Sequence, residues 1–216
     1  MFVVWVVFAG ACGGGARSVR PDEMSAAQHR EEAKRSAQAA DAHERRYDPT
    51  GLAVPPPADS NGPVYNFTIG VYNPTEWHLD EAERLRQHGE QHKKAAKRLE
   101  QFEATACKQF PPTTRAACPL LGPVVAIGDI PGGIRVIFAV GTRVDAILAH
   151  MRCHFAYAQT RGFADAAACP LYIRGAEIRL GAVSQSVEIV SKEDTTTEEI
   201  RRRSREEAVY LGQRGP

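Results

Sequence analysis

Small apolar residues recur at helical spacing in the first part of the chain. Ser25 and Gln28 stand three apart, as the N-cap and N3 residues of a capping box do, and Pro49 ends the pattern. Between them the apolar positions follow at intervals of three, four and seven: Ala33, Ala37, Ala40 and Tyr47. This spacing predicts an amphipathic helix that begins at Ser25 and ends before Pro49.

A second helical pattern begins after residue 72. Asn73 as N-cap, Pro74 in the first turn and Glu76 at N3 predict a helix that runs to about Ala106. Its apolar stripe contains few large side chains: Ala82, Leu85, Gly89, His92, Ala96, Leu99 and Phe102. We therefore expect a helix with little hydrophobic surface to bury.

The two helical stretches resemble each other after a shift of 49 residues. The shift superposes five pairs: His29 on His78, Glu32 on Glu81, Ala33 on Ala82, Arg35 on Arg84, and His43 on His92. Because 49 is a multiple of seven, it preserves the heptad register. The matches predict a diverged repeat that forms a helical pair or arm with exposed charged faces. Shared Ala, Glu, Arg and His composition is the other explanation of these matches.

Bulkier apolar residues lie in the second half of the chain. Strands are predicted at 124–127 and at 134–140, where Ile, Val, Phe and Val alternate, and a further hairpin and strand at 171–174, 177–180 and 187–190. Helices are predicted between residues 142 and 162 and again from Asp194. This order of elements predicts an α+β fold, a small antiparallel sheet with helices on one face.

The chain divides into three parts by composition. Residues 1–24 are expected to be a signal segment, lipid anchor and tether, for the reason given below, and residues 25–106 a charged helical arm with a proline-rich linker at 48–73. Residues 107–216 are expected to be a disulfide-stapled α+β domain with a C-terminal helix.

Charge and composition exclude two classes of protein. The 216 residues carry 27 basic and 26 acidic side chains, a net charge of +1, so composition supplies no attraction to nucleic acid. A hydrophobic fraction of 43% is too high for a wholly disordered chain. The arginines at 201–205 lie among six acidic residues between positions 193 and 207 and have no aromatic platform, which indicates a charged helix face. We expect no nucleic-acid partner.

The N-terminus is an apolar run from Met1 to Cys12, too short to span a bilayer. The stretch Ala9-Gly10-Ala11-Cys12, followed by three glycines, resembles the lipobox of bacterial lipoproteins. The resemblance covers about the first fifteen residues. It implies that Cys12 is lipidated and anchors the protein to a membrane of the bacterial envelope, facing the periplasm or the cell surface. A buried N-terminal strand is the alternative interpretation.

The four other cysteines suit two disulfides in an oxidising compartment. The segments 116–120 and 167–171 are both Ala-Ala-Cys-Pro-Leu, and each follows a predicted helix that carries another cysteine. The simplest pairing is therefore Cys107 with Cys118 and Cys153 with Cys169. Four reduced thiols, or other pairings such as Cys107 with Cys153, are the alternatives.

Two histidine pairs have the i, i+4 spacing that lets two imidazoles bind one metal. His150 and His154 lie on the flank of a predicted apolar stripe, where a partly buried hydrogen-bonding role is the alternative. Residue 151 is Met where a zinc protease needs Glu, so no general base for hydrolysis is present. His88 and His92 lie among Gln, Lys and Glu, which favours a solvated polar face.

No complete catalytic or nucleotide-binding motif occurs in the sequence. The first hypothesis is a non-enzymatic envelope lipoprotein without a cofactor, which has a structural or protein-interaction role and a protein partner. The alternative is a periplasmic protein that binds zinc or another transition metal through His150 and His154. The third is an enzyme with a site assembled from scattered residues.

Overall fold

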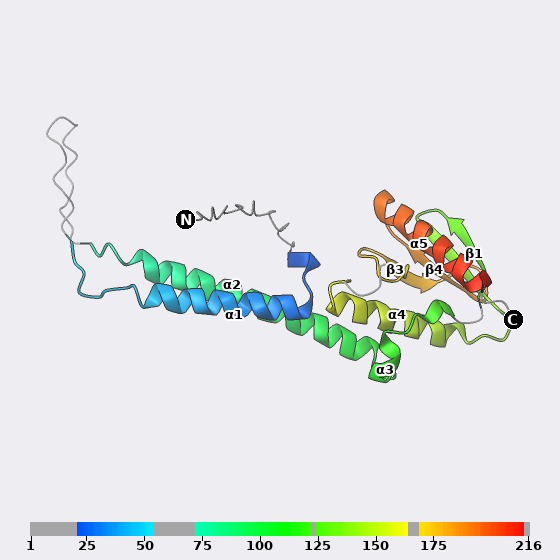
Figure 1. The fold of residues 1–216 in the computed structure, drawn as a ribbon, viewed down its shortest axis with the longest axis horizontal. Helices are drawn as coiled ribbons and strands as arrows, with labels where there is room; N and C mark the ends of the chain where they lie inside the picture. The colour runs from blue at the N-terminus through cyan, green and yellow to red at the C-terminus, as the bar shows by residue number, and fades with distance from the viewer. Residues whose placement is uncertain (1–20, 54–71, 122–123, 164–168, 214–216) are drawn as a thin grey trace, which may run out of the picture.

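The computed structural model describes residues 21–53, 72–121, 124–163 and 169–213 and has an elongated shape (Figure 1). A helical hairpin extends from a compact unit that contains the sheet (Figure 1). Cys12 and the rest of the predicted signal segment up to residue 20 lie outside the described residues, as does most of the linker. Among the described residues, no helix is both long and apolar enough to cross a bilayer.

The hairpin consists of α1 (Ala26–Glu44), preceded by the short 3-10 helix η1 (Pro21–Glu23), and α2 (Trp77–Ala106). The predicted capping box is confirmed, since Ser25 Oγ accepts the Gln28 amide at 3.1 Å and Gln28 Oε1 accepts the Ser25 amide at 2.7 Å. The predicted start of α2 is a few residues early. Asn73 accepts the Thr75 amide at 2.8 Å and so closes the turn before the helix.

Small residues and histidines fill the contact between α1 and α2, which we call the seam. The buried seam residues follow heptad spacing on both helices: Ala26, His29, Ala33, Ser36 and Ala40 on α1, and Ala82, Gly89, His92 and Ala96 on α2. A Cβ added at Gly89 would lie 3.2 Å from the Ala33 carbonyl oxygen. The two backbones therefore approach more closely than larger seam residues would allow.

The compact unit contains one antiparallel sheet in the order β1-β2-β4-β3. Its strands are β1 (Val124–Ile130), β2 (Gly133–Phe138), β3 (Glu177–Leu180) and β4 (Ser186–Val190). The helices of this unit are α3 (Pro112–Arg115), η2 (Pro119–Leu121), α4 (Val144–Thr160) and α5 (Asp194–Gln213). The α+β prediction is confirmed.

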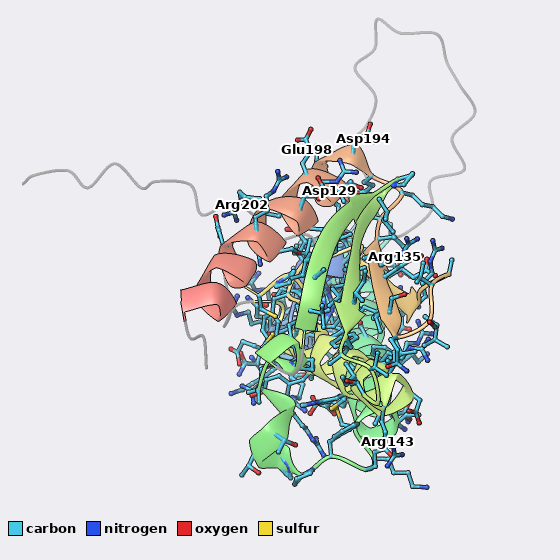
Figure 2. The ribbon with its side chains drawn as sticks, turned by 90° about the vertical axis from the view of Figure 1, so that its right-hand side faces the viewer. Asp129, Arg135, Arg143, Asp194, Glu198 and Arg202 are labelled. Carbon is cyan, nitrogen blue, oxygen red and sulfur yellow. A yellow bond between two sulfur atoms is a disulfide. The ribbon has the colours of Figure 1, made fainter. Side chains whose placement is uncertain are left out.

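Alternation along the strands puts the core on one face of the sheet. Ile134, Val136 and Phe138 point into a core shared with α4 and α5. On the other face, buried Glu188 lies between Arg135, at 2.8 Å, and Arg179, at 3.0 Å. The hydrogen bond from Arg135 is the main reason that the pKa of Glu188 lies below its usual value. Figure 2 shows α5 and Arg135 on opposite sides of the strands.

One predicted strand is wrong. Residues 171–174 form turns, and β3 pairs with β4 instead of with this segment. Pro170 cannot donate a ladder hydrogen bond, and Leu171, Tyr172 and Ile173 are all buried, whereas a strand would send alternate side chains to opposite faces. Residues 171–173 are therefore buried in the core instead of pairing with a strand.

A disulfide joins the hairpin to the compact unit. It links Cys107, at the end of α2, to Cys153, in the middle of α4, with the Cα atoms 4.6 Å apart. The expected pairing of Cys107 with Cys118 and of Cys153 with Cys169 is therefore wrong. Local sequence order suggested that each helix pairs with its own following loop, but packing of α2 against α4 brings the two helix cysteines together.

Candidate metal centre

Three ligand-bearing side chains converge beside α4. The sulfurs of Cys118 and Cys169 lie 3.4 Å apart, and Cys169 Sγ lies 3.4 Å from Nε2 of His154. All three potential ligand atoms lie within 4.8 Å of one another. His154 and Cys169 are buried and Cys118 is half-buried, so the cluster has one side nearer to solvent.

The two Cys-Pro-Leu segments place the two thiols. Leu120 and Leu171 are both fully buried in the same core. Each leucine fixes its segment against α4, and the cysteine two residues earlier then reaches the same point beside His154. The local repeat that suggested two separate disulfides instead brings its own two cysteines together.

Neighbouring elements hold the backbone around the thiols. Arg203 of α5 donates to the carbonyl oxygens of Cys169 and Tyr172, at 3.3 and 3.1 Å. On the other side, Arg115 forms an ion pair with Glu103 of α2 at 2.8 Å. Contacts from α2 and α5, which are far apart in the sequence, therefore fix the loops that carry the two cysteines.

His154 is oriented toward the thiols by a backbone hydrogen bond. Its Nδ1 lies 2.8 Å from the carbonyl oxygen of Arg115, and its side chain is only 1% exposed. Because a carbonyl can only accept, Nδ1 carries the proton and Nε2 presents a lone pair to the sulfurs. Burial is the main cause that lowers the pKa of His154, so the imidazole is neutral at pH 7.

His150 lies outside this cluster. Its Nε2 donates to the Thr114 carbonyl at 3.0 Å, and its ring stacks on Phe110 with the ring centroids 4.8 Å apart. The predicted His150–His154 pair therefore holds two successive carbonyls of the α3 segment, while only His154 approaches the thiols. Spacing along a helix could not identify the cysteines as its partners, because they come from distant loops.

The donor set suits a soft metal ion. Two thiolates and one imidazole are ligands typical of Zn²⁺ and Cu⁺. Zn–S bonds of about 2.3 Å in tetrahedral geometry hold two sulfurs about 3.8 Å apart, close to the 3.4 Å found here. Three protein ligands leave a fourth position for another donor. The alternative chemistry is a second disulfide, which requires the sulfurs to approach to about 2.05 Å.

Five histidines form a second cluster, in the seam of the hairpin. His29 and His92 are joined by their Nδ1 atoms at 2.8 Å, and His43 and His78 likewise at 3.0 Å. His88 Nε2 lies 3.3 Å from His92 Nε2. The expected solvated face around His88 and His92 is wrong for His92, which is 7% exposed. The heptad spacing of these histidines was the signal in the sequence that could have indicated their place in the seam.

Comparison of this chain with protein-family models, with curated proteins and with solved structures gave no match.

Proposed function

We propose that this is a metal-binding protein in which Cys118, Cys169 and His154 hold a soft transition metal, with Zn²⁺ as the first candidate. The observation that carries the proposal is the convergence of two sulfurs and one correctly oriented imidazole nitrogen within 4.8 Å. The proposal keeps His154 from the sequence-based alternative and replaces His150 by the two thiols.

Metal binding would connect three separate segments. Cys118 precedes η2, His154 lies on α4, and Cys169 precedes the turn that α5 holds through Arg203. The hydrogen bond from His154 Nδ1 to the Arg115 carbonyl is the kind of outer contact that fixes the orientation of a metal-bound imidazole. Thiolates are the binding form, so uptake of the metal releases protons and strengthens as the pH rises.

The test is metal binding to the full chain, purified without metal and kept anaerobic so that the thiols stay reduced. We expect one Zn²⁺ per chain by calorimetry and elemental analysis, and a thiolate-to-metal charge-transfer band when Co²⁺ replaces Zn²⁺. Cys118→Ser, Cys169→Ser and His154→Asn should each weaken binding by at least about tenfold, a loss typical of a missing ligand or outer contact.

His150→Asn is the matched control, since it removes an imidazole one turn away that contacts Thr114 and not the thiols. It should keep the metal stoichiometry and the Co²⁺ spectrum. No Zn²⁺ uptake by the reduced protein would contradict the proposal. So would equal binding by the wild type and all three ligand variants, or a Cys118–Cys169 disulfide in protein isolated without added oxidant.

We further propose that the protein works in the bacterial envelope, anchored by lipid on Cys12. The lipobox-like segment supports this setting, and the Cys107–Cys153 disulfide agrees with an oxidising compartment. Expression in a bacterial host should give a membrane-bound product that detergent extracts. Cys12→Ser should release it, and a soluble product that still carries Met1 would contradict the anchor.

A protein-interaction role for the arm is the second candidate. Three large apolar side chains near its far end are well exposed: Leu52 at 67%, Tyr72 at 48% and Trp77 at 55%. Exposed aromatic residues are typical of protein contacts. A photo-crosslinker at Trp77 should give one defined adduct in cells, whereas the same group at exposed Glu90, in the middle of α2, should not. Equal labelling from both positions would reject an interaction at the tip.

A further inference from the structure

The seam histidines form two layers related by pseudo-two-fold symmetry. His29 contacts His92 in one layer, and His43 contacts His78 in the other. The 49-residue shift maps His29 onto His78 and His43 onto His92, so it exchanges the two layers. The repeat found in the sequence is therefore expressed as an antiparallel pair in which each half supplies one histidine to each layer.

The first layer belongs to a longer chain of hydrogen bonds. A neutral imidazole has one donor and one acceptor nitrogen, so the bonds along the chain all point the same way. When His29 Nδ1 accepts from His92 Nδ1, His92 Nε2 accepts from His88 Nε2.

The last bond of the chain follows from the same reasoning. His88 Nδ1 accepts from the Ser36 hydroxyl, 2.9 Å away. In this arrangement each of the three contacts has one donor and one acceptor while all three imidazoles are neutral.

This chain can accept only one additional proton. If Ser36 turns its hydroxyl to accept from His88, one extra proton on the imidazoles still leaves every bond with one donor and one acceptor. A second proton would place two N–H groups against each other at 2.8 or 3.3 Å. The His43–His78 pair likewise takes up only one additional proton, because only one N–H fits between its two Nδ1 atoms.

Few carboxylates lie near the seam histidines to stabilise additional protons on them. Glu32 is the carboxylate that acts on His92, and Glu81 interacts with His43 but is held by Arg84 at 2.7 Å. Arg46 opposes a proton on His78. The ion pairs between the helices, Arg30–Glu100 and Arg86–Glu44, are exposed and contribute little.

We propose that the arm is a proton-operated hinge, closed while the seam histidines are neutral, in which α1 separates from α2 as they take up protons. The seam otherwise consists of alanine, glycine and serine, so little buried apolar surface opposes separation. The linker between the helices and the contact of α2 with α4 keep both helices attached to the molecule when they part.

The direction of the pH dependence follows from proton counting. Burial, followed by the neighbouring histidines, lowers the pKa values of His29 and His92 below the ordinary 6.5, and the pKa of His78 is lowered in the same direction. The separated helices therefore bind more protons than the closed hairpin as the pH falls below 6.5, and the closed state loses stability there. Five imidazoles protonate in the open arm against two in the closed one, an uptake of about three protons.

The test measures amide hydrogen exchange of the full chain between about pH 8 and about pH 4.5, corrected for the intrinsic effect of pH on exchange. Peptides from α1 and from residues 77–95 of α2 should lose protection below about pH 6, and the opening constant should rise up to about a thousandfold per pH unit. Peptides from β2 and β4 should change far less, because His154 is the one fully buried imidazole in the described part of the compact unit.

Variants separate the histidines from the carboxylates. The double substitution His88→Gln with His92→Gln should reduce the pH dependence by about two protons, whereas His150→Gln should leave it unchanged. Acid opening that is the same in the seam variant and the wild type would assign the effect to glutamate protonation and overturn the proposal. Unchanged protection of the wild-type arm down to about pH 4.5 would also overturn it.

A second readout needs no variant in the seam. Trp77 lies beside His43 and His78, with ring centroids 5.4 and 3.8 Å apart. In the full chain with Trp5→Phe, Trp77 is the remaining tryptophan, and its fluorescence should change with the same midpoint as the arm's exchange. NMR titration should show His29 and His92 protonating below the free imidazole. Values at or above 6.5 for both would contradict a proton-operated hinge.

Discussion

The hairpin and the compact unit are stabilised by different means. The core beside the sheet contains large apolar side chains with almost no exposure, among them Phe138, Ile134 and Met151. The seam of the hairpin contains alanines, a glycine and paired histidines. Burial of a Phe, Ile or Met side chain contributes about 1.5–3 kcal/mol, whereas an alanine methyl contributes about 0.8 kcal/mol. The hairpin must therefore obtain more of its stability from close fit and hydrogen bonds.

This difference determines how each region responds to its surroundings. Hydrophobic burial is nearly independent of pH, so the compact unit should respond mainly to changes in volume. Hydrogen bonds between neutral imidazoles depend directly on protonation. One chain thus combines a region that holds its shape with a region whose shape depends on pH, and a disulfide connects them at the end of α2.

The largest effect should come from the apolar core. Phe138→Ala removes a side chain that is 2% exposed and should lower the free energy of unfolding of the compact unit by roughly 3–5 kcal/mol. Chemical denaturation monitored by hydrogen exchange of β2 and β4 peptides measures it. Val140→Ala is the matched control, because Val140 is 98% exposed and continues the same apolar pattern. Similar losses from both would contradict the position of the core.

Removal of the disulfide should come next. Cys107→Ala with Cys153→Ala opens a loop of 46 residues and should cost roughly 2–4 kcal/mol. The loss should appear at the contact of α2 with α4, where protection of residues 99–106 falls first. Peptide mapping without reduction should show this link in the wild type. A Cys107–Cys118 link found instead would contradict the structure.

The seam should be sensitive to size rather than to loss of apolar surface. Gly89→Leu adds a side chain where even a Cβ meets the Ala33 carbonyl at 3.2 Å, so it should destabilise the hairpin by roughly 1–3 kcal/mol. Gln91→Leu is the control, since Gln91 is exposed on the same helix. Faster exchange in α1 for Gly89→Leu alone is expected. No change would mean that the helices do not approach as closely as described.

The smallest effect should come from the capping box. Ser25→Ala removes the acceptor of the Gln28 amide and should cost about 1 kcal/mol. The loss should appear as fraying of the first turn of α1 and leave β2 and β4 unchanged, as measured by exchange of peptides from each region. Ser25→Asp, which retains a capping oxygen, should restore most of the stability. An equal loss for both variants would assign the effect to packing instead.

Several features were predictable from the sequence because they depend on local rules. The capping box at Ser25 and Gln28 requires only two residues three apart, and the alternation at Ile134, Val136 and Phe138 identifies a strand with one buried face. The order of elements was sufficient for the α+β class. The apolar stripe predicted for the second helix also contained His92, which is buried in the seam.

The partners of these residues depended on contacts between distant segments. Cys107 pairs with Cys153 because α2 packs against α4, and the two Cys-Pro-Leu segments meet because Leu120 and Leu171 enter one core. The sequence contains the same four cysteines in any pairing, and local spacing favoured the wrong one. Of the three residues of the candidate metal centre, the sequence therefore predicted His154 as a ligand and did not predict its two thiol partners.

The sequence by itself determined the order of most helices and strands, which of their faces are apolar, and the five matches between the two helical stretches at a 49-residue shift. Only the tertiary structure decided that these two helices lie antiparallel, so that His29 meets His92 and His43 meets His78. The physical reason is the separation in sequence of the residues that interact. Capping, periodicity and turns are fixed by residues a few positions apart, whereas side-chain pairing across 63 positions exists only after burial has chosen which surfaces touch.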